Sequence, residues 1–126
     1  MAVANTQELQ ARPNRTQPWS RHLTLLTVLS TFTLVVLGAV VRVTGSGLGC
    51  PDWPLCHGGI LPPLESQAVI EYSHRVIASF LVGPLILATV AGAWLAFRHV
   101  LWLIVPATMA LVMLVAQAIL GGITVL

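Results

Sequence analysis

Residues 23–41, LTLLTVLSTFTLVVLGAVV, decide the fold, because this run contains no charged residue. Two further uncharged runs follow at residues 76–97 and 100–126. Each run is close to or above the roughly 20 apolar residues that a helix needs to cross a hydrocarbon core of about 30 Å. The sequence therefore predicts an all-α fold, a polytopic membrane helix bundle with three transmembrane helices.

The composition supports this fold class. Hydrophobic residues make up 56% of the 126-residue chain and charged residues only 8%, whereas a soluble domain normally carries about 25% charged residues. A small soluble domain must cover itself with polar surface, but a lipid-facing surface removes that need. The net charge of +2 and the lack of a basic stripe with interleaved aromatic residues argue against nucleic-acid binding.

The placement of arginines predicts the orientation, since cytoplasmic segments carry an excess of basic residues. Arg12, Arg15 and Arg21 precede the first run, and Arg98 lies between the second and third. Residues 43–73 contain neither arginine nor lysine. We therefore expect a multi-pass protein of the cell membrane with a cytoplasmic N-terminus and a first loop on the outer side.

The chain divides into two parts. Residues 1–20 are polar and without apolar periodicity, which predicts a disordered cytoplasmic tail. Residues 21–126 form the membrane domain, with helices at about 22–43, 69–97 and 100–122 and an outer loop at 44–68. Pro84 and Pro106 predict local kinks, because neighbouring groups can satisfy the carbonyls that a proline leaves free in a spanning helix.

The outer loop carries the two cysteines of the chain, Cys50 and Cys56, among glycines and prolines that favour tight turns. On an oxidising side the two can pair. One interpretation is a structural staple worth about 2–3 kcal/mol, and the other is a redox-active pair that passes electrons. A metal site with His57 is a weaker alternative, because the spacing fits no common zinc pattern.

The segment IEYSHR at residues 70–75 brings ionisable groups to the start of the second helix. Glu71 lies three residues before His74 and four before Arg75, so all three share one helix face. They could be ordinary interfacial residues, but the depth of His74 also suits an axial ligand of a heme. In that case Arg42 and Arg75 could bind the propionates, and Glu71 could stabilise charge or move a proton at the porphyrin edge.

Three motifs resemble those of heme A synthases, in the same order along the chain. GAVVRVTGSGLGCPDWPLC at residues 38–56 resembles the end of that family's first helix and its outer loop. IEYSHR resembles the start of its second helix, and QAILGGITVL at residues 117–126 resembles the end of its third.

The resemblance implies an eight-helix membrane fold of two four-helix halves, of which this chain would supply part of the first. It implies a membrane oxidoreductase that converts the methyl group of heme O to the formyl group of heme A for cytochrome oxidase. His74 would then be a heme ligand, Glu71 a catalytic residue, and Cys50–Cys56 a disulfide that could transfer electrons. Heme O would be the substrate, and a heme b cofactor would be expected mainly in the second half.

The family continues beyond the point where this chain stops, so we expect either a fragment or a partner chain that supplies the remaining helices. A heme O synthase and a second copy of the chain are further candidate partners. Two other functions remain open from the residues alone. One is a thiol–disulfide membrane oxidoreductase that exchanges electrons with a quinone, and the other is a non-catalytic heme-binding subunit.

Overall fold

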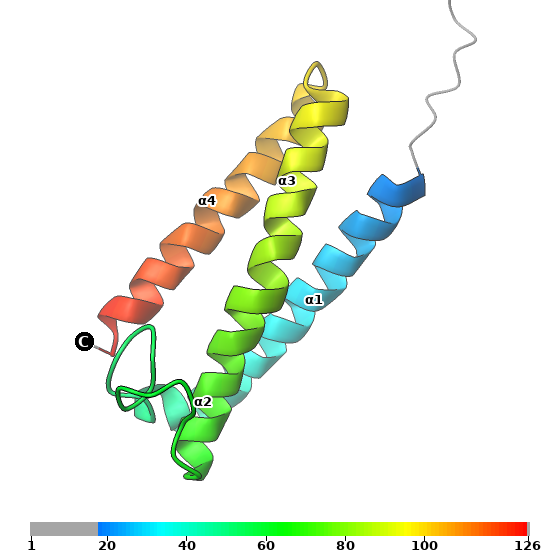
Figure 1. Cartoon of the computed structure of the whole chain (residues 1–126). Coiled ribbons are helices and arrows are strands. Elements are labelled where there is room, and N and C mark those ends of the chain that lie inside the picture. Colours follow the sequence, from blue (N-terminus) through cyan, green and yellow to red (C-terminus); the bar gives the residue numbers. More distant parts are fainter. Residues whose placement is uncertain (1–17, 126) are drawn as a thin grey trace, which may run out of the picture.

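The computed structural model describes residues 18–125, and in this part of the chain it is built from helices without β-strands (Figure 1). Most of the predicted N-terminal tail therefore lies outside the described residues. The elements in chain order are α1 (Pro18–Val43), the short 3-10 helix η1 (Ser46–Leu48), α2 (Ser66–Ile77), the π-helical turn η2 (Ala78–Val82), α3 (Gly83–Phe97) and α4 (Leu101–Ile123).

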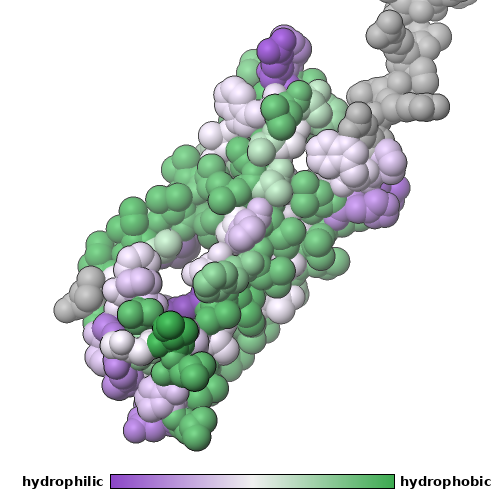
Figure 2. All heavy atoms as spheres, in the orientation of Figure 1, coloured by the Kyte–Doolittle hydropathy of each residue, from purple (hydrophilic) through white to green (hydrophobic). Residues whose placement is uncertain are grey.

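Three helical segments are long and apolar enough to cross a membrane, as predicted. They are Pro18–Val43, Ser66–Phe97 and Leu101–Ile123, with 26, 32 and 23 residues. The second is continuous through α2, η2 and α3. Figure 2 shows hydrophobic side chains along the helices and hydrophilic ones gathered toward the two ends. The protein is an all-α, multi-pass membrane protein.

Two helix starts differ from those expected. The first helix begins at Pro18 instead of about residue 22, and a proline is well suited to a first helical position because its missing N–H needs no partner there. The second begins at Ser66 instead of about residue 69, and the Val69 N–H already bonds to the Glu65 carbonyl at 3.0 Å. The loop between the helices is shorter by this added turn.

The second spanning helix widens into a π-helical turn just before Pro84. Pro84 has no N–H to donate to the carbonyl four residues earlier. Ala78–Val82 forms a π-helical turn, and the Gly83 N–H bonds to the Ala78 carbonyl five residues back. The expected distortion is thus a local π turn before Pro84. Pro106 lies inside α4, which is continuous across it.

The helices pack around a small apolar core. Val82, Ile86 and Val90 are buried against partly buried residues of α1 and α4, namely Leu34, Ala107, Leu111 and Leu114, and against Ile77 of α2. Helices α3 and α4 pack side by side as an antiparallel hairpin (Figure 1). Thr27 of α1 and Thr89 of α3 add a hydroxyl–hydroxyl hydrogen bond of 2.8 Å inside the span. Most other large apolar side chains of the helices point outward, toward the region that lipid would fill.

Candidate functional site

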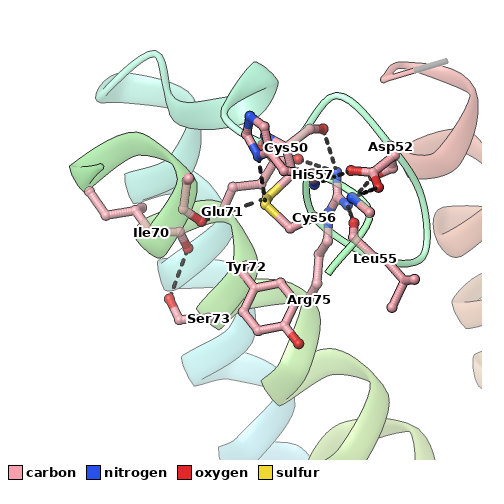
Figure 3. The surroundings of a disulfide bond; sticks show 12 residues. Cys50, Asp52, Leu55, Cys56, His57, Ile70, Glu71, Tyr72, Ser73 and Arg75 are labelled. Atoms are coloured by element: carbon pink, nitrogen blue, oxygen red, sulfur yellow. Dashed lines mark hydrogen bonds and ion pairs between the residues drawn. A yellow bond between two sulfur atoms is a disulfide. The ribbon is translucent and has the colours of Figure 1, made fainter. Parts of the chain in front are cut away.

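The loop between α1 and α2 is closed by a disulfide, which confirms the predicted pairing. Cys50 and Cys56 are bonded, with their Cα atoms 4.8 Å apart, and both residues are fully buried. Figure 3 shows the bond beneath the loop and beside α2. Cys50, Cys56 and Ala68 form a small core of their own, against which Tyr72 packs. The disulfide loop, residues 50–56, is thus a packed part of the fold.

Asp52 shapes the end of this loop. Its carboxylate accepts the N–H groups of His57 and Gly58, each at 2.6 Å. Both of those residues have a left-handed backbone, with φ of 53° and 70°. The Gly58 N–H, followed by that of His57, holds the pKa of the Asp52 carboxyl below its ordinary value of 3.8. A charged Asp52 therefore stabilises a turn that costs conformational energy at His57.

Glu71 lies under the disulfide loop. Its side chain is 6% exposed. One carboxylate oxygen accepts the Cys50 N–H at 2.8 Å, and the other accepts a hydrogen bond from the Arg75 guanidinium. Burial of a carboxylate is costly unless it is paired and hydrogen-bonded, and here it is both. The structure thus ties the predicted acidic residue to the backbone of a cysteine.

Arg75 binds the loop at three points (Figure 3). Its Nη1 donates to the carbonyls of Asp52 at 2.6 Å and Leu55 at 3.0 Å, and its Nη2 donates to the carbonyl of Cys50 at 3.2 Å. Carbonyls from the whole length between the two cysteines therefore converge on one guanidinium. A planar group with several fixed N–H donors suits this arrangement in a way that a lysine ammonium does not.

His74 points away from this network and toward α1. A Cβ atom added at Gly38 would lie 3.1 Å from the His74 Cε1, so the imidazole packs directly on the backbone of α1. The Nδ1 of His74 is buried and has no hydrogen-bond partner within residues 18–125. Buried polar atoms without a partner are rare in proteins. This one marks a ring whose bonding capacity the described residues leave unused.

The predicted site residues therefore fall into three groups. Glu71 and Arg75 form one contact network with the disulfide loop. His74 comes from the same helical turn but faces α1. Arg42 is exposed in the last turn of α1 and lies outside the network of hydrogen bonds found among the described residues.

Two residues of the site were missed in the sequence. A Cβ at Gly49 would lie 2.6 Å from the backbone carbonyl carbon of Gln67, so the loop can dock on α2 only with glycine there. Trp53 lies against the buried Gly122 at the end of α4, where an added Cβ would be 3.5 Å from the indole Cδ2. The glycines of the loop predicted tight turns, but nothing in their pattern indicated which glycine or tryptophan packs against a helix.

The metal alternative finds no support in the described part of the chain. Residues 18–125 contain no group of three or more histidine, cysteine, aspartate or glutamate side chains that could hold a metal ion. The two cysteines are consumed by their mutual bond. His57 places its Nδ1 3.6 Å from the Cys56 sulfur, which is a contact with the disulfide.

Fold and site together define a class: an integral membrane protein in which a disulfide-closed loop binds a spanning helix. On that helix, the Nδ1 of His74 is buried without a partner among residues 18–125. A family model described as cytochrome oxidase assembly protein, COX15-CtaA, matches residues 21–69. No solved structure matches the chain significantly.

The similar curated proteins are heme A synthases. The chain is 38% identical to that of Bacillus licheniformis over 79% of its own length and 33% of the relative's. It is 38% identical to that of Bacillus pumilus, covering 82% of this chain and 35% of the relative, and 37% identical to that of Exiguobacterium sibiricum, covering 82% and 36%. The chain thus spans about a third of the length of these relatives. These matches confirm the resemblance to heme A synthases that was seen in the three sequence motifs.

Proposed function

We propose that this chain is the N-terminal part of a heme A synthase, which oxidises the methyl group of heme O to the formyl group of heme A for cytochrome oxidase assembly. The observation that carries the proposal is His74. Its imidazole lies inside a membrane span and packs on Gly38, and its buried Nδ1 has no partner in residues 18–125. The similarity to heme A synthases over most of this chain supports the same reaction.

The residues present would hold a heme through His74. A histidine that binds iron uses one ring nitrogen and leaves the other for an outer partner, and the buried Nδ1 of His74 has no partner among residues 18–125. Bound heme would supply the iron for oxidation, as substrate heme O and as a heme b cofactor. His74 would hold and orient the iron, and the surrounding apolar helices would keep water away from it.

The other polar residues take separate roles in this proposal. Arg42, exposed at the end of α1, would bind propionate carboxylates. Glu71 would act on the reaction chiefly by fixing the disulfide loop on α2, since its two oxygens are bound to Cys50 and Arg75. A proton-transfer role for Glu71 would require it to leave one of these partners.

The disulfide supports the orientation that the arginines predict. A buried disulfide forms and persists on an oxidising side, so we place the loop outside and the N-terminus in the cytoplasm. Its burial also favours the heme proposal over a thiol–disulfide oxidoreductase. Neither cysteine has exposed surface while the loop is docked, so exchange with a thiolate requires the loop to loosen first, which disfavours exchange in every catalytic cycle.

The test is heme binding by His74→Ala, with His99→Ala as the matched control. His99 lies in the α3–α4 turn at the opposite end and accepts a hydrogen bond from its neighbour Arg98. Both variants would be purified from membranes and examined by absorption spectroscopy and by mass analysis of extracted hemes. We expect His74→Ala to lose the absorption spectrum of the heme held by this residue and to make no heme A. His99→Ala should keep both the spectrum and the product. Unchanged heme content and formyl product in His74→Ala would refute the proposal.

A further inference from the structure

Arg75 has almost no bonding capacity left in the oxidised protein. Each of its two terminal nitrogens carries two N–H groups. Nη1 bonds to Asp52 and Leu55, and Nη2 bonds to Cys50 and Glu71. The side chain is 14% exposed. A guanidinium in this state is not free to bind the carboxylate of a ligand.

The contacts depend on a closed loop. The three carbonyls belong to residues inside the ring that the Cys50–Cys56 bond closes. Glu71 holds the Cys50 N–H while Arg75 holds the Cys50 carbonyl, so both backbone polar groups of this cysteine are bound by α2. Breaking the disulfide would increase the conformational entropy of the loop. Holding its three carbonyls against the Arg75 guanidinium would then cost more free energy.

We infer that Glu71 and Arg75 are positioning residues for the disulfide loop, and that reduction of Cys50–Cys56 releases the Arg75 guanidinium for a carboxylate-bearing ligand at this end of the span. The contacts and the disulfide stabilise each other, because a coupling between two sites is reciprocal. The carboxylate part of the inference rests on the proposed function, in which heme propionates are the ligand. The coupling of the loop to Arg75 does not.

The redox step is a two-electron exchange with a dithiol. A thiolate of the dithiol attacks one loop sulfur, which breaks the Cys50–Cys56 bond, forms a mixed disulfide and releases the other loop cysteine as a thiolate. The second thiolate of the dithiol then attacks its own sulfur in the mixed disulfide and releases the remaining loop cysteine. The dithiol becomes a disulfide, and the two cysteines take up its two protons as thiols. Because both cysteines are buried, the loop must loosen before the first attack.

The first experiment labels arginines with phenylglyoxal in the full chain, in detergent, before and after reduction by dithiothreitol. Arg42 and Arg98 are exposed and serve as internal references. We expect labelling of Arg75 to rise at least fivefold on reduction while the references stay constant, as read by peptide mass spectrometry. The double variant Cys50→Ser/Cys56→Ser should resemble the reduced protein. Equal protection of Arg75 in both redox states would overturn the inference.

The second experiment measures the equilibrium between the disulfide and dithiothreitol. Glu71→Gln and Arg75→Lys should each make the disulfide about tenfold easier to reduce, which is about 30 mV for a two-electron couple. Glu65→Gln is the matched control, since Glu65 is exposed and its side chain makes no capping bond to α2. Equal equilibrium constants in all three variants and the parent would also overturn the inference.

Both readouts work without heme. Failure of the heme proposal would therefore leave the labelling result intact, and His74→Ala should label like the parent. If Arg75 is released but heme content does not depend on the redox state, the positioning role stands and the carboxylate ligand is refuted.

Discussion

The two ends of the molecule are held together by different kinds of contact. At the loop end, a glycine meets backbone: a Cβ on Gly49 would lie 2.6 Å from the Gln67 carbonyl carbon. At the opposite end, a glycine meets a side chain: a Cβ on Gly92 would lie 3.0 Å from the Trp19 ring. Next to the first contact, Glu71 and Arg75 bind the backbone of Cys50, whereas the second contact lies between the apolar helices α1 and α3. The packing at the loop end therefore tolerates little change in side-chain size, whereas at the other end the Trp19 side chain can move.

The largest effect should come from Gly49→Ala. The new methyl group would overlap backbone atoms of α2, so the loop must lift from the helix. We expect the free energy of unfolding to fall by about 3 kcal/mol or more, which is the upper end of the range typical of overpacking. Thermal unfolding in detergent measures this change.

Two matched glycines sharpen that result. A Cβ added at Gly47 would have no atom within 4 Å, so Gly47→Ala should change the free energy of unfolding little. Gly92→Ala should change stability by less than Gly49→Ala, because an indole ring can shift where a backbone cannot. A loss in Gly92→Ala as large as in Gly49→Ala would remove the distinction between the two ends.

A smaller effect is expected from Thr27→Val inside the span. Thr27 is buried, and its hydroxyl bonds to Thr89 at 2.8 Å and to the Leu23 carbonyl at 2.9 Å. Hydrogen bonds between membrane helices contribute about 0.6 kcal/mol on average. We expect a loss of about that size in unfolding from mixed micelles, with Thr33→Val as the control, since Thr33 is exposed and bonds only within α1. A loss well above 1 kcal/mol would show that polar contacts matter as much in the span as at the loop.

The smallest effect should be the pH dependence of the loop turn. The pKa of Asp52 is lowered because its carboxylate accepts the Gly58 and His57 N–H groups. A lowered folded-state pKa gives stability that is present above the unfolded value of 3.8 and is lost as the pH falls through the folded value. Hydrogen exchange at His57 and Gly58 should therefore stay protected from pH 7 to pH 5, after correction for intrinsic rates, and accelerate below about pH 4. Asp52→Asn should show weaker protection at pH 7 and lose this dependence, and retained dependence in that variant would assign it to another group.

The sequence predicted more about the fold than about the site. Residues 23–41 predicted a spanning helix because these 19 uncharged residues are close to the length that a helix needs to cross a bilayer. The spacing of Glu71, His74 and Arg75 predicted one shared helix face, and Glu71 and Arg75 do meet across one helical turn. The sequence did not predict the partners of Glu71 and Arg75, because the loop that these residues contact lies about 20 residues earlier in the chain. His74 shares their helical turn, yet it packs on Gly38 of another helix.

By itself the sequence determined which segments are helical and apolar, since hydropathy and length act locally and independently of what packs nearby. Tertiary structure alone decided that Arg75 is bound to loop carbonyls and that the buried Nδ1 of His74 has no partner in the described part of the chain. Hydrogen bonds depend on the distance and angle between groups that only folding brings together. A residue's identity gives its bonding capacity, and the fold decides where that capacity is used.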